Sequence, residues 1–105
     1  MLSIDRDSRE FVGAEVSALV HGRAYDPTSD VVEFAFTGPD DTRPTDWFAG
    51  VWDTPPPGAS SYRAQVLIGP GGSGPELAPG TYRMWVRVTD SPERPVIPVG
   101  ALTIT

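Results

Sequence analysis

ELAPGTYRMWVRVTD, residues 76–90, is the stretch of sequence that decides the fold. Pro79 and Gly80 form a turn, and from Tyr82 onward the residues alternate between two faces. One face carries Tyr82, Met84, Val86 and Val88, and the other carries Arg83, Trp85, Arg87 and Thr89. A period of two with one apolar face is typical of a half-buried antiparallel strand. The stretch therefore predicts a turn followed by a strand.

The order of residues at the start of this strand indicates a particular corner. A leucine, a Pro-Gly turn and a tyrosine that opens a strand resemble the E–F corner of immunoglobulin-like sandwiches, where the tyrosine hydroxyl bonds to upstream backbone. The corner residues here are Leu77, Gly80 and Tyr82. We expect the Tyr82 hydroxyl to be mostly buried and bonded to backbone between the preceding strand and Gly80. The corner indicates a fold, and such sandwiches carry many unrelated functions.

Further strands are predicted along the chain, separated by turn signals. They cover residues 2–4, 11–20, 31–38, 47–54, 62–68 and 94–105. The segment WFAGVWDT has an ambiguous alternation, so it is either buried on both faces or exposes one aromatic set. In the last segment Pro95, Pro98 and Gly100 predict an edge position or a bulge.

About seven short strands with no convincing helix predict an all-β chain. With 105 residues, 12 prolines and 11 glycines, we expect one domain over residues 1–105: a single immunoglobulin-like antiparallel β-sandwich with a tyrosine corner.

Charge and composition disfavour several classes of function. The net charge is −6 and the eight basic residues are all arginine, which disfavours nucleic acid and anionic membranes as partners. The chain has no cysteine, which excludes disulfides and thiolate chemistry. The charged stretch DRDSRE near the N-terminus lacks the apolar core of a signal peptide, so we expect a soluble product of the cytosol.

Three features resemble catalytic or ligand-binding sites, but structural roles in loops and turns are favoured for each. His21 is the only histidine, and nothing in the sequence places a nucleophile beside it, so a solvated loop residue is favoured. The acidic pairs Asp5/Asp7, Asp26/Asp30 and Asp40/Asp41 are typical of turns. The run GPGGSGP lacks the lysine and helix of a phosphate-binding loop, which favours a mobile hairpin tip. We assign no catalytic residue, cofactor or metal, and expect a protein that is not an enzyme.

The polar face of the strand at residues 82–89 is the best candidate for a binding surface. It carries Arg83, Trp85 and Arg87, and is expected to be joined by Arg63 and by Trp47 or Trp52. Tryptophan and arginine are enriched at interface hot spots. Alternatively, Trp85 packs beneath a loop or across the sheet, or the aromatic face holds sugar rings.

Three segments carry a resemblance that spans almost the whole chain. IDRDSREFVGAEV (4–16), YDPTSDVVEFAFT (25–37) and LAPGTYRMWVRVTDSPERPVIPVGALTIT (77–105) resemble small immunoglobulin-like virion proteins of tailed phages of actinobacteria. The resemblance implies a structural protein, made in the host cytoplasm and incorporated into the virion. Such proteins decorate the capsid or sit at the head-to-tail connector or tail, where many copies bind a repeated surface by a sheet face or an edge strand. It also implies an alternative, a tail-associated carbohydrate-binding or adsorption module.

Overall fold

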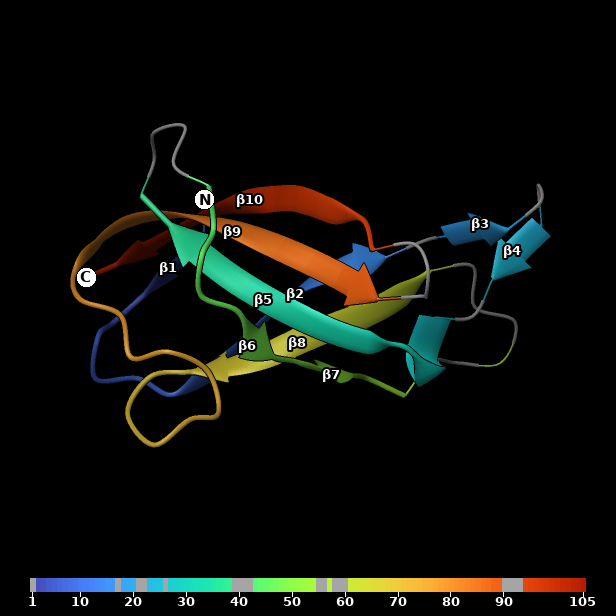
Figure 1. Ribbon diagram of the computed structural model, residues 1–105. Helices are drawn as coiled ribbons and strands as arrows, with labels where there is room; N and C mark the ends of the chain where they lie inside the picture. Colours follow the sequence, from blue (N-terminus) through green and yellow to red (C-terminus); the bar gives the residue numbers. More distant parts are fainter. Residues whose placement is uncertain are drawn as a thin grey trace.

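The computed structural model describes residues 2–16, 18–20, 23–25, 27–38, 43–54, 57, 61–89 and 94–105, and this part of the chain is all-β (Figure 1). The strands are β1 (Leu2–Ile4), β2 (Glu10–Val16), β3 (Ala18–Val20), β4 (Arg23–Tyr25), β5 (Val31–Thr37), β6 (Phe48–Ala49), β7 (Val51–Trp52), β8 (Tyr62–Ile68), β9 (Gly80–Thr89) and β10 (Val96–Ile104). The one helix within these ranges is a 3₁₀ turn, η1 (Pro27–Ser29).

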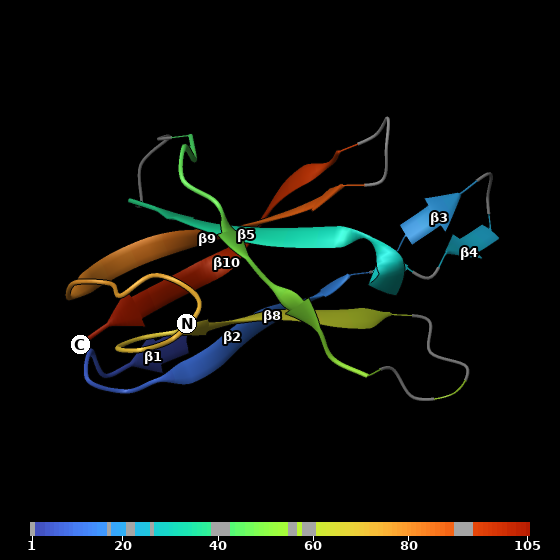
Figure 2. The same ribbon diagram turned by 60° about the horizontal axis from the view of Figure 1, so that its bottom comes forward.

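Two sheets enclose the core. The first has five strands in the order β1-β10-β9-β5-β6, and the second has three in the order β2-β8-β7. Figure 2 shows the two sheets as separate layers, with the small β3–β4 hairpin at one end. Buried side chains from both layers form one cluster, whose largest fully buried members are Phe34, Ile68, Leu102, Val12, Val66 and Val86.

The predicted alternation in β9 is confirmed. Met84, Val86 and Val88 are buried in the core cluster. β9 lies in the middle of the five-stranded sheet, where it pairs antiparallel with both β5 and β10. The strand with the clearest alternation in the sequence is therefore also central in the sheet.

One strand pair departs from the predicted antiparallel arrangement. β1 runs parallel to β10, with Leu2 opposite Leu102 and Ile4 opposite Ile104, so the five-stranded sheet is mixed. Backbone hydrogen bonds continue this pairing, from Thr105 N–H to the Ile4 carbonyl and from Arg6 N–H to the Thr105 carbonyl. The chain also has more strands than the predicted seven, since ten are described.

The predicted single strand at residues 11–20 is two strands. β2 pairs with β8 until Val16 stands opposite Tyr62, the first residue of β8. Because β8 begins there, the ladder has no further partner, and β3 instead forms a local hairpin with β4. β4 lies between the predicted strands 11–20 and 31–38, where the sequence predicts only turn signals. Alternation alone does not reveal where a partner strand stops.

The ambiguous segment WFAGVWDT crosses from one sheet to the other at Gly50. β6 pairs with β5 in the five-stranded sheet, and β7 pairs with β8 in the three-stranded sheet. The Gly50 N–H continues the first pairing by donating to the Val32 carbonyl at 2.9 Å. A Cβ atom at position 50 would lie 2.7 Å from the Phe34 ring, so the crossing requires glycine. Phe48 and Trp52, on either side of Gly50, both pack against the core, while Ala49 and Val51 are exposed. The segment therefore has one inward face, and Trp47 of the other aromatic set lies on the outside.

The last strand contains the predicted bulge. The register between β10 and β9 shifts between Pro98 and Gly100, and Gly100 has a φ of +151°. Val99, the extra residue, packs against the core. Only the end of β10 is covered by β1, so among the described residues its first half forms an outer edge of the sheet.

Candidate docking face

The tyrosine corner has the predicted hydrogen bond. The Tyr82 hydroxyl donates to the Ala78 carbonyl at 2.7 Å, and Ala78 lies between β8 and Gly80. Leu77 and Tyr82 are both partly buried against the core. The expectation of a mostly buried hydroxyl is wrong, because this hydrogen bond is exposed while the ring is half-buried. Water therefore has access to both polar partners.

Trp85 lies on the outer face of the five-stranded sheet, but its indole is covered. The side chain is only 5% exposed, so the prediction of an exposed docking tryptophan is wrong. Its Nε1–H donates to Thr37 Oγ1 at 2.9 Å. The guanidinium carbons of Arg43 and Arg83 lie 5.7 and 6.0 Å from the ring centroid. Both structural alternatives offered by the sequence are observed, because Trp85 bonds across the sheet to Thr37 and lies beneath Arg43 of a neighbouring loop.

Arg87 forms the second half of the same surface. Its Nε and Nη2 groups donate to Glu33 Oε1 at 3.1 and 2.9 Å, directly across the β9–β5 pair. Its guanidinium carbon also lies 4.2 Å from the centroid of the Trp47 ring. The segment before β6, which contains Trp47, enters from the outer side of this sheet (Figure 2). Trp47 thus joins the surface, as one of the two predicted alternatives.

Two of the predicted residues lie elsewhere. Trp52 is half-buried against the core, and its Nε1–H donates to the Asp30 carbonyl at 3.0 Å. Arg63 lies on β8 of the other sheet, opposite Glu15 of β2. Its side chain is on the face of β8 that points away from the core, since Ala64, Val66 and Ile68 are the buried residues of this strand. The prediction that Arg63 joins Arg83 is therefore wrong, because matching alternation does not specify which sheet a strand belongs to.

The structure adds three residues to this surface that the sequence analysis did not select. Arg43 lies in a loop without periodicity, and Glu33 and Thr37 lie on the outer side of β5. Together they complete the Arg–Trp cluster, defined here as Glu33, Thr37, Arg43, Trp47, Arg83, Trp85 and Arg87. The signal for Glu33 and Thr37 was their parity in β5, since they stand opposite Arg87 and Arg83.

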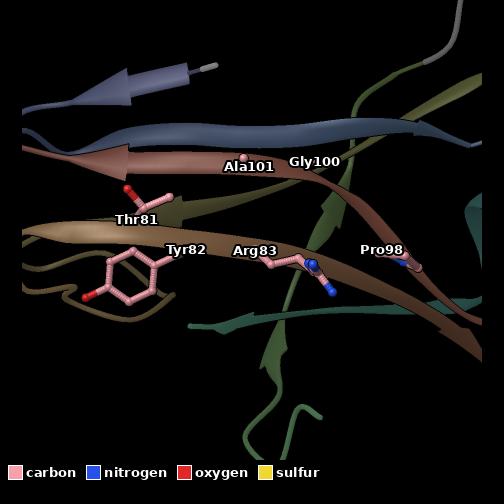
Figure 3. A pocket seen from close by; sticks show the side chains of 6 residues that line it. All are labelled: Thr81, Tyr82, Arg83, Pro98, Gly100 and Ala101. Atoms are coloured by element: carbon pink, nitrogen blue, oxygen red, sulfur yellow. The ribbon is translucent and has the colours of Figure 1, made fainter. Parts of the chain in front are cut away.

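A shallow pocket of about 320 Å³ adjoins the cluster. Figure 3 shows its lining: Thr81, Tyr82 and Arg83 of β9, and Pro98, Gly100 and Ala101 of β10. Arg83 stands opposite Ala101, and Thr81 is two residues before Arg83, so the pocket opens on the outer face. The bulge provides the space, because a Cβ atom at Gly100 would meet no atom within 4 Å.

The other candidate sites have simple structural roles or are not described. The Asp7 N–H donates to Asp5 Oδ1 at 2.8 Å, a hydrogen bond that is typical of an aspartate that stabilises a turn. The glycine-rich loop is bonded internally, with Gly72 N–H donating to the Gly69 carbonyl at 3.0 Å, and to β8, with Gly74 N–H donating to the Leu67 carbonyl at 2.8 Å. His21, Asp26, Asp40 and Asp41 lie outside the described residues.

The described ranges hold neither a metal-binding cluster nor a membrane-spanning helix. They contain no group of His, Cys, Asp or Glu side chains arranged to hold a metal ion. No helix in the described part of the chain has the length and apolar character needed to span a bilayer.

Comparisons with protein-family models, with curated proteins and with solved structures found no match to this chain.

Proposed function

We propose that this protein is a non-enzymatic structural component of a phage virion that docks on a repeated capsid or connector surface through the outer face of its five-stranded sheet. The observation that carries the docking role is the Arg–Trp cluster, which gathers three of the eight arginines of an acidic chain on one sheet face. The sequence resemblance to small virion proteins of tailed phages supports the location.

We further propose that the fold is an immunoglobulin-like sandwich. In that fold, strands C, F and G form one sheet, B, E and D lie in the other, and some members add C′ beside C. The observed order β10-β9-β5-β6 corresponds to G-F-C-C′, and β2-β8-β7 corresponds to B-E-D. The Tyr82 hydrogen bond then falls at the start of strand F, where the tyrosine corner belongs.

The composition of the face supports a protein partner. Arginine and tryptophan are enriched at the energetic centres of interfaces, and lysine, which this chain lacks, is depleted there. The buried Trp85 gives the arginines a rigid base, since its indole N–H is fixed by Thr37. A surface built in this way needs little reordering on binding, which lowers the entropic cost of association.

The alternative, a tail-associated carbohydrate-binding module, has less support. Such a site needs an indole face free to stack on a sugar ring. Trp85 is buried, Trp52 is half-buried against the core, and Trp47 has the Arg87 guanidinium over its ring. The observations therefore favour the protein partner over the sugar.

Mass spectrometry of purified virions tests the proposal. We expect this chain in particles purified from the phage that encodes it, at a copy number that matches a symmetry element of the capsid, connector or tail. An internal control is any capsid protein quantified in the same sample. If the chain is absent from intact virions but present in the lysate, a structural role in the particle is wrong.

A further inference from the structure

We propose that Arg43 and Arg83 form a receptor for a single carboxylate side chain of the docking partner, at the edge of the pocket between β9 and β10. This inference rests on the proposed docking function and names the chemistry that the docking face recognises. The observation behind it is that two guanidinium groups lie over one buried indole, in contacts that use none of their N–H donors.

The first argument is that, among the described residues, no ion pair is recorded for Arg43 or Arg83. The one ion pair recorded in the described ranges joins Arg87 to Glu33. Arg43 and Arg83 instead contact the Trp85 ring, an interaction that uses none of the N–H donors of a guanidinium. Each guanidinium has five such donors. Both guanidinium carbons thus lie within 6.0 Å of the same ring centroid, on a chain of net charge −6.

The second argument is the space beside Arg83. The pocket of about 320 Å³ has Arg83 on one wall and small residues, Gly100 and Ala101, opposite it. Thr81 is exposed and adds a hydroxyl to the lining. The bulge at Gly100 leaves this space open on the side of β10. A side chain of a partner can therefore enter beside the guanidinium without displacing the sheet.

The third argument is the match between ligand and site. A guanidinium binds a carboxylate through two parallel hydrogen bonds, and the buried Trp85 ring shields one side of the site from water, which strengthens that attraction. A polyanion such as nucleic acid carries many charges and is repelled by the acidic chain. A single Asp or Glu side chain gains the local attraction with little of this repulsion.

The test is a titration of the purified chain with the blocked peptide acetyl-Gly-Glu-Gly-amide, followed by the NMR signal of the Trp85 indole N–H. The signal is assigned from a Trp85→Phe sample. The matched probe is acetyl-Gly-Gln-Gly-amide, which has the same shape without the charge. We expect a saturable shift with the glutamate peptide and none with the glutamine peptide.

Four variants then locate the site. Arg43→Gln and Arg83→Gln are each expected to weaken binding at least about tenfold, the effect of losing a charged hydrogen bond. Their controls are Arg94→Gln, which is exposed like Arg43, and Arg63→Gln, which is half-buried like Arg83. The controls change the net charge equally and are expected to bind as the parent does. Arg83→Lys replaces Arg83→Gln if the latter fails to fold.

Three results would overturn the receptor. The first is equal shifts with both peptides, and the second is an equal loss of affinity in the control variants. The third is a gain in affinity of about tenfold or more in Asp40→Asn/Asp41→Asn, which would mean that acids of the chain itself already occupy the arginines. The experiment needs no virion. Failure to find the chain in particles would refute the proposed location and leave the outcome of this titration unchanged.

Discussion

The indole Nε1–H of Trp85 donates a 2.9 Å hydrogen bond to the hydroxyl oxygen of Thr37, which connects β9 to β5 on the outer face of the five-stranded sheet. Both residues are buried, at 5% and 8% exposure. The pair shows that this face has a second, small packed layer of its own, in addition to the core between the sheets. The arginines of the Arg–Trp cluster lie on that layer.

Removal of the acceptor at position 37 is expected to destabilise the fold. Thr37→Val keeps the shape of the side chain but leaves the buried Trp85 N–H without a partner, at a cost of about 1–3 kcal/mol. Urea denaturation measures the loss. Thr81→Val is the control, because Thr81 is exposed on β9, the strand of Trp85, and its change is expected to cost less than about 0.5 kcal/mol. Equal midpoints for the two variants would mean that the Trp85 hydrogen bond contributes nothing.

Loss of the Tyr82 hydroxyl is expected to have a small effect. In Tyr82→Phe the Ala78 carbonyl loses its donor, but water reaches this exposed position, so we expect a cost of about 0.5–1.5 kcal/mol. Thermal or urea denaturation measures it. Tyr82→Ala also removes the half-buried ring and is expected to cost clearly more. An unchanged midpoint for Tyr82→Phe would show that the corner hydrogen bond has no net stabilising effect.

A methyl group at the sheet crossing is expected to disrupt packing. Gly50→Ala places a Cβ atom 2.7 Å from the fully buried Phe34 ring, and we expect overpacking to cost about 1–3 kcal/mol. Phe34→Leu removes the ring atoms that would clash. The double variant is therefore expected to be more stable than the sum of the single effects predicts, by about 1 kcal/mol. Strict additivity would indicate that the clash is not the cause.

The ion pair of Arg87 and Glu33 is expected to contribute modestly. A double-mutant cycle with Arg87→Gln and Glu33→Gln isolates the pair, because the contact of Arg87 with Trp47 is lost in both backgrounds. We expect a coupling of about 0.5–1 kcal/mol, since the side chains are 17% and 23% exposed and directly opposite across the strands. The cycle of Arg83→Gln with Glu33→Gln is the control and is expected to show almost no coupling.

Local patterns in the sequence predict the strands and their inward faces well. The alternation of Met84, Val86 and Val88 identified the central strand, and Pro98 with Gly100 indicated the bulge. The Tyr82 bond was predicted as well, because its partner lies only four residues away. These features depend on neighbouring residues along the chain.

Features that depend on distant segments were not predictable from the same patterns. The period of β9 placed Trp85 on the outer face but did not reveal that Arg43, from a loop without periodicity, covers it. Arg63 has the same outward parity as Arg83, but its strand belongs to the other sheet. The split at Gly50 required knowledge of the Phe34 ring. In each case a segment far along the chain decided the outcome.

The bulge in β10 also bears on how the protein behaves at high concentration. The first half of this strand is an outer edge among the described residues, and Val96 and Ile97 there are 42% and 49% exposed. Such an edge is where chains add to one another and aggregate. Pro98 lacks an N–H to offer a second chain, and the bulge twists the strand away from a flat register. Copies of the chain can thus remain separate from one another at high concentration.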